Sequence, residues 1–77
     1  MKADVVLFDG FDELDALGPY EVLALARRFG GPVEVRLVTV EPRDEVTGDH
    51  GTTVRPHGVL DDEADLVVVP GGGWSDR

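Results

Sequence analysis

The sequence contains no cysteine, and this absence removes two common ways of stabilising a small chain. A disulfide framework is excluded, and so is a structural metal site built from clustered cysteine and histidine. A chain of 77 residues buries only about 60 to 65% of its unfolded surface on folding. We therefore expect a thin core whose stability depends on packing or on a partner.

Long apolar runs and basic residues are also scarce. The first apolar run, residues 5–8, is too short for a signal sequence or a membrane span, so we expect a cytoplasmic protein without a membrane partner. Acidic residues outnumber basic ones 16 to 7, and the arginines are scattered along the chain. A phosphate backbone would be repelled, so we do not expect this segment to bind nucleic acid.

The sequence that is present predicts a strand, a helix, a strand, an excursion and a last strand. Residues 4–8 are continuously apolar after Asp4, which is typical of a strand buried on both faces of a parallel sheet. Residues 13–29 have apolar side chains at helical spacing, with Asp12 as a good N-cap and Gly-Gly-Pro as a stop signal. Two further strands are expected, at residues 33–40 and 65–69.

Two parts of this pattern are irregular. Pro19 lies inside the predicted helix, so either the helix bends there or its regular part begins at Pro19. Between the second and last strands, residues 45–47 and 52–55 predict a small hairpin. The acidic residues 60–64 then predict a single helical turn.

This order of elements indicates an α/β fold, the opening of a doubly wound parallel sheet. Ligands of such sheets bind beyond the carboxyl ends of the strands. Two loops should converge there, residues 9–15 after the first strand and residues 71–73 after the last. We therefore place a candidate site between these two loops.

Asp15 is the first candidate site residue. A carboxylate in the first turn of a helix at the ligand edge can accept a proton or tune a thiol, although it can also simply complement the helix dipole. Gly71 and Gly72 are the others, because backbone N–H groups of a glycine loop can form an oxyanion hole, although the loop can equally be a tight turn. Neither a dinucleotide fingerprint nor a P-loop is present, so no cofactor is expected.

The remaining polar residues favour no metal site. His50 and His57 fall in the polar excursion, where histidines are usually solvated, and they have no partner at metal-ligand spacing. Four acidic residues follow the first predicted strand, and their order indicates a solvated acidic edge rather than a magnesium site: Asp9, Asp12, Glu13 and Asp15. Trp74 and Ser75, after the glycines, could line a pocket but need no functional explanation.

Several of these segments together resemble a known family. Residues 6–11 and 13–23 resemble the opening of the ThiJ/PfpI superfamily, the class I glutamine-amidotransferase-like proteins, with a Gly-Pro-x-Glu-Val-Leu helix after a Leu-Asp pair. Residues 51–56 and 65–72 match the later pattern, so the resemblance spans nearly all of the chain. It is greatest to the branch that contains isonitrile hydratases and the amidase-like domains of some transcription regulators.

The resemblance implies a flavodoxin-like α/β/α sandwich, usually a homodimer, with a reactive cysteine on a strand-to-helix elbow. An acidic residue of the first helix hydrogen-bonds that cysteine, and a glycine loop supplies backbone N–H groups. In this sequence the matching positions are Asp15 for the acidic partner and Gly71 and Gly72 for the donors. The resemblance also makes Pro19 an expected residue of the helix.

The absence of cysteine then predicts that residues 1–77 are the amino-terminal part of one ThiJ/PfpI-like domain. The complete domain is expected to be a cysteine-dependent hydratase or hydrolase of a small molecule, and this part alone is expected to be inactive. A ligand-sensing domain of a transcription regulator is the alternative. A third outcome, in which uncovered strands pair with another copy, would be an aggregation hazard rather than a function.

Overall fold

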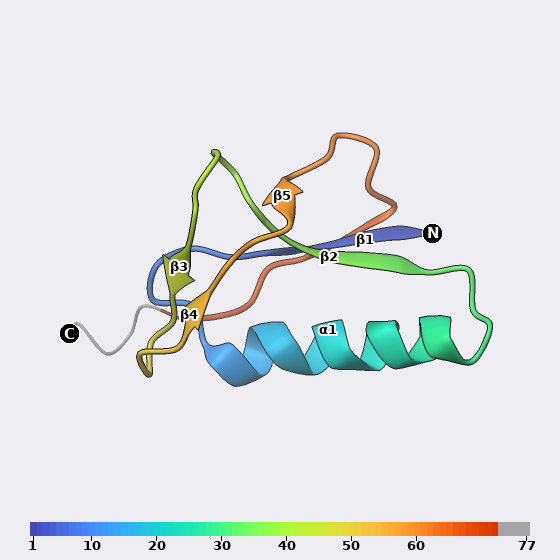
Figure 1. Ribbon diagram of the computed structural model, residues 1–77, viewed down its shortest axis with the longest axis horizontal. Helices are drawn as coiled ribbons and strands as arrows, with labels where there is room; N and C mark the ends of the chain where they lie inside the picture. The colour runs from blue at the N-terminus through green and yellow to red at the C-terminus, as the bar shows by residue number, and fades with distance from the viewer. Residues whose placement is uncertain (73–77) are drawn as a thin grey trace.

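The computed structural model describes residues 1–72, which form a parallel sheet, a helix and a separate hairpin (Figure 1). The sheet has the strand order β5-β2-β1-β6, and every pair in it is parallel. Its strands are β1 (Lys2–Val6), β2 (Glu34–Thr39), β5 (Gly58–Val59) and β6 (Leu66–Val68). The order of β2, β1 and β6 is that of the first three strands of flavodoxin-like sheets. The predicted α/β class is therefore confirmed.

The central strand β1 is buried, as its continuous apolar run predicts. Ala3, Val5 and Leu7 are at most 2% exposed. The strand begins and ends two residues earlier than predicted, because its register with β2 runs from Lys2 to Val6. Leu7 still donates its N–H to Val38 O at 2.7 Å, after which the chain turns away from the sheet.

Helix α1 (Glu13–Arg28) lies along one side of the sheet (Figure 1). The predicted N-cap is confirmed, because the Asp12 carboxylate accepts a hydrogen bond from the Asp15 N–H at 3.0 Å. The helix ends at the expected place, where Gly30 has a φ of +93° that an L side chain rarely adopts. Since the helix begins at Glu13, the alternative start at Pro19 is wrong.

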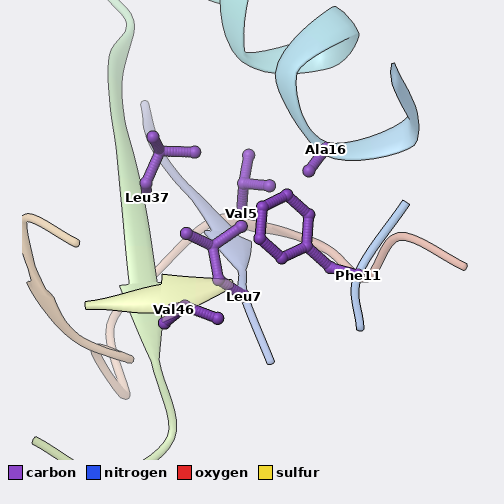
Figure 2. Close-up of a cluster of buried hydrophobic side chains, with 6 residues drawn as sticks. All are labelled: Val5, Leu7, Phe11, Ala16, Leu37 and Val46. Atoms are coloured by element: carbon purple, nitrogen blue, oxygen red, sulfur yellow. The ribbon is translucent and has the colours of Figure 1, made fainter. Parts of the chain in front are cut away.

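The core lies where α1, the sheet and the hairpin meet. Figure 2 shows its six buried side chains, which come from β1 and the loop after it, from α1, from β2 and from β3: Val5, Leu7, Phe11, Ala16, Leu37 and Val46. Phe11 is the largest of them and is fully buried. It lies in the loop between β1 and α1, so the core extends to the edge of the sheet where the candidate site is predicted.

The segment between β2 and β6 agrees only partly with the sequence analysis. The predicted hairpin is present as β3 (Val46–Thr47) paired antiparallel with β4 (Thr53–Val54). The helical turn predicted at residues 60–64 is a single hydrogen-bonded turn and not a helix: the Ala64 N–H donates to Asp61 O at 3.1 Å, and the Glu63 N–H donates to the Asp61 side chain at 2.8 Å. Strand β5 has only two residues and no apolar run to predict it.

Strand β6 is at the edge of the sheet and is largely uncovered. Leu66 is 39% exposed and Val67 is 45% exposed. Within residues 1–72 no helix follows β6. No helix in that part of the chain has the length and apolar character needed to cross a membrane.

Candidate functional site

The candidate site lies at the carboxyl ends of β1 and β6, which are adjacent and parallel. In sheets of this order the loops on either side of such a pair leave in different directions and open a crevice. Here the two loops touch at their bases. Asp12 donates its N–H to Gly71 O at 2.8 Å, and Phe11 forms an antiparallel bridge with Gly72. The predicted convergence of the two loops is therefore present.

Gly72 allows this close approach. A Cβ atom at this position would lie 2.3 Å from Gly10 O and 2.8 Å from Phe11 Cα, far inside van der Waals contact. The residue also has a φ of +150°, which L side chains rarely adopt. The glycine is thus required both by the backbone conformation and by the neighbouring loop.

Asp15 lies just after the first of these loops, and Gly71 and Gly72 lie in the second. Asp15 is in the first turn of α1 with an exposed side chain. The Gly71 and Gly72 N–H groups donate no hydrogen bond to any of residues 1–72. Gly73, Trp74 and Ser75, which were also considered, lie outside the described residues.

Glu13 is a residue whose importance the sequence analysis missed. Its carboxylate lies in the turn between β3 and β4, where Oε2 accepts the N–H groups of His50 at 2.9 Å and Thr52 at 3.2 Å. Oε1 lies 2.9 Å from His50 Nδ1, and the Glu13 side chain is only 14% exposed. An exposed helix N-terminus was expected, but the hairpin folds over it.

The environment of Glu13 favours its ionised form. Burial opposes ionisation, but the hydrogen bonds from the His50 side chain and from three backbone amides outweigh it and lower the pKa of Glu13 to about 2. The same hydrogen bond to Glu13 raises the pKa of His50 above its usual value. Each partner thus stabilises the charged form of the other.

This pair predicts a stability maximum between two pH limits. The lowered pKa of Glu13 contributes stability above its ordinary value of 4.5, and that contribution is lost as the pH falls towards 2. The raised pKa of His50 contributes stability that is complete below its ordinary value of 6.5 and is lost as the pH rises through the raised value. Urea unfolding across a pH series, followed by circular dichroism, measures both limits.

Two variants test whether the Glu13–His50 pair causes these two pH limits. In Glu13→Gln the free energy of unfolding should fall less than in wild type as the pH is lowered, and in His50→Asn it should fall less as the pH is raised above 6.5. The comparison with wild type is essential because hydrogen bonds also lower the pKa of Asp9 and Asp61, which therefore contribute to the acid limit. Variant curves that run parallel to wild type over the whole range would show that the pair does not contribute.

The sequence predicts that both histidines are solvated loop residues. In the structure, both make contacts within the chain. His50 is exposed but pairs with Glu13. His57 accepts the N–H of Leu37 at its Nδ1, 2.9 Å away, and its ring lies 6.0 Å from that of Tyr20. His57 therefore supports β2 and lies against α1.

Three of the four acidic side chains that follow β1 have partners within the chain. Asp9 pairs with Arg43 at 3.0 Å, and hydrogen bonds from Arg43 and from the Thr47 amide lower its pKa. Asp12 caps α1, and Glu13 is held by the hairpin. Within residues 1–72 no three or more histidine, aspartate or glutamate side chains are grouped to hold a metal ion.

The comparisons with known proteins agree with this geometry. The family model described as the DJ-1/PfpI family matches residues 1–77, the whole chain. The chain belongs to the DJ-1/PfpI family. This confirms the resemblance found in the sequence. No curated protein matches the chain.

Several solved structures share the fold. Toxoplasma gondii DJ-1 in its oxidized form has a TM-score of 0.78 at 23% identity, covering 92% of this chain and 38% of its own. A cysteine-to-alanine mutant of a DJ-1 superfamily protein from Salmonella typhimurium gives 0.80 at 24%, covering 92% and 38%. An AraC family transcriptional regulator from Pseudomonas putida gives 0.78 at 23%, covering 95% and 41%. The chain thus spans about two fifths of the length of these structures.

Proposed function

We propose that residues 1–77 form part of a small-molecule enzyme domain whose nucleophile is a cysteine outside this chain. Asp15 would form one wall of the site and the Gly71 and Gly72 amides another. The observation that supports this proposal is the contact between the two loops, where the Asp12 N–H meets Gly71 O at 2.8 Å. With this contact, the Asp15 carboxylate and the Gly71 and Gly72 N–H groups would face a ligand from the same edge of the sheet, which supports the proposal.

The chemistry of these groups fits a thiol-dependent hydration or hydrolysis. An Asp15 carboxylate can accept a hydrogen bond or a proton from a neighbouring thiol, and so select its reactive form. Open amides at Gly71 and Gly72 can stabilise the negative charge that develops when a nucleophile adds to a carbon–nitrogen or carbonyl group. We infer isonitrile hydration as the particular reaction, because the sequence resembles that branch of the family most.

The proposal includes the state of the whole protein. A homodimer is inferred from the resemblance, and α1 together with its C-cap Phe29 leaves large apolar side chains exposed. Leu14 is 79% exposed, Val22 is 65% exposed and Phe29 is 87% exposed. Such a helix is consistent with burial against further protein.

Asp15→Asn tests the proposed role directly. The experiment uses the protein in which residues 1–77 are joined to a cysteine-bearing remainder, and it follows loss of the infrared band of a small isonitrile. We expect kcat to fall about 100-fold or more, because loss of a positioned proton acceptor typically has an effect of this size. Glu21→Gln, which changes another exposed acid of the same helix, should leave kcat unchanged. Full activity of Asp15→Asn would contradict the proposal.

A ligand-sensing domain of a transcription regulator is the second candidate. It is favoured by the likeness of fold to the Pseudomonas putida regulator, which extends over 95% of this chain. A regulator should carry a basic DNA-binding helical domain in the same polypeptide and should bind its ligand without turnover. Turnover that depends on a cysteine would decide for the enzyme.

A further inference from the structure

We propose that Glu13 is a positioning residue for the proposed site. Its carboxylate fixes the β3–β4 hairpin over the loop between β1 and α1, and the hairpin in turn holds that loop against Gly71 and Gly72. The consequence for activity rests on the proposed function, but the positioning itself rests only on contacts within the chain.

The first step is the attachment of the hairpin turn to α1. Two backbone N–H groups of the turn, from His50 and Thr52, point at one oxygen of Glu13, and His50 Nδ1 lies against the other. Gly48 makes room for the carboxylate, because a Cβ there would lie 2.6 Å from both Glu13 Cδ and Oε2. Hydrogen bonds to an ionised acceptor are roughly twice as strong as neutral ones. The turn is therefore built around this side chain.

The second step joins the hairpin to the loop that follows β1. Gly10 donates its N–H to Thr47 O at 2.8 Å, and Asp49 donates its N–H to Phe11 O at 2.8 Å. Both bonds are made by hairpin residues that precede His50, the first residue that Glu13 holds. Moving the hairpin away would break both of them.

The third step joins this loop to the glycine loop. Asp12 donates its N–H to Gly71 O, and Gly72 packs directly on Gly10 and Phe11. These contacts join α1 to the hairpin and the hairpin to the β1–α1 loop, which leads back into α1. The glycine loop is attached to the β1–α1 loop. Glu13 makes the contact between α1 and the hairpin, and it lies two residues before Asp15. Both proposed walls of the site therefore depend on Glu13.

Amide hydrogen exchange measured by NMR on the chain tests the positioning. Glu13→Ala should speed exchange of the Gly10 and Asp49 amides at least about 10-fold, since each loses the support of a charge-assisted contact. The Leu7 amide, bonded to Val38 O in the sheet, should keep its rate. An equal acceleration at Leu7 would show that the change acts only on global stability, and unchanged rates at Gly10 and Asp49 would overturn the proposal.

Two further variants separate the hydrogen bonds from other effects of the substitution. Glu13→Gln keeps an acceptor oxygen but removes the charge near the helix N-terminus, so it should restore most of the slow exchange if the hydrogen bonds are responsible. Gly48→Ala leaves Glu13 in place but forces its carboxylate out of the turn, so it should reproduce the effect of Glu13→Ala. Slow exchange in Gly48→Ala would contradict the proposed route.

Activity then separates this proposal from the function on which it rests. In the protein joined to its cysteine-bearing remainder, Glu13→Ala should lower kcat more than it changes KM, and Glu13→Gln should recover it. If exchange responds as expected but no variant or wild type hydrates isonitriles, the positioning stands and the proposed reaction falls. If exchange does not respond, the positioning falls whatever the activity.

Discussion

Replacing Gly72 by alanine is expected to destabilise the protein by about 2 to 3 kcal/mol, which combines overpacking with backbone strain. The added methyl group would meet Gly10 O, Phe11 Cα and Asp12 N, all of them backbone atoms that cannot rotate away. The glycine loop must then leave the β1–α1 loop. Urea unfolding gives the free energy, and the Asp12 amide, which loses Gly71 O as its acceptor, should exchange faster.

Gly30→Ala is the matched control for this variant. Gly30 also has a positive φ, +93°, but nothing lies within 4 Å of a Cβ atom there. Its cost should be limited to backbone strain, about 1 kcal/mol. An equal loss in the two variants would mean that the contact between the loops contributes nothing. A loss confined to Gly72→Ala, with faster exchange at Asp12, would support the loop contact on which the candidate site depends.

The main elements of the fold could be predicted because each has a local physical cause. The continuous apolar run of β1 requires burial on both faces, and Asp12 with Gly30 marks the two ends of α1. Strand β5 could not be predicted, because a strand of two residues carries no periodicity. It forms by pairing with the free edge of β2 at Val38 and Thr39. The turn at Asp61 depends on a side-chain hydrogen bond that competes with the helix.

The candidate site, like the fold, could be predicted from the sequence only in part. The meeting of the two loops follows from the parallel pairing of β1 with β6, which the order of elements predicts. The attachment of Glu13 to the hairpin does not follow from local sequence, because it joins residues 37 to 39 positions apart. An acidic residue in a first helical turn ordinarily faces solvent. The small Gly48 and the charged His50 in the predicted hairpin are the only local hints.

A second charged group that the sequence does not reveal lies on β1. Asp4 is 1% exposed, and its carboxylate oxygens accept Nε and Nη2 of Arg36, both at 3.3 Å. The N–H of Asp61 also donates to Asp4, at 3.0 Å, while Arg36 reaches Val59 O at 3.1 Å. The hydrogen bonds that Arg36 donates to Asp4 raise the pKa of Arg36. One ion pair therefore connects β1, β2, β5 and the turn before β6.

Arg36→Met is expected to destabilise the protein by about 3 kcal/mol, because it leaves the Asp4 carboxylate buried without its cation. The methionine keeps most of the apolar length of the side chain, so lost packing contributes little. Urea unfolding followed by circular dichroism measures the effect. Arg55→Met is the control, since Arg55 is exposed and its replacement should change the free energy by no more than about 0.5 kcal/mol.

The double variant Asp4→Asn with Arg36→Met distinguishes an unpaired charge from a simple loss of contacts. Asparagine is neutral and still offers an oxygen to the Asp61 N–H, so it needs no cation. If the buried charge causes the loss, the double variant should be more stable than Arg36→Met alone by more than about 1 kcal/mol. A double variant as unstable as the sum of its single changes would assign the loss to the contacts of Arg36, including Val59 O, and not to the charge of Asp4.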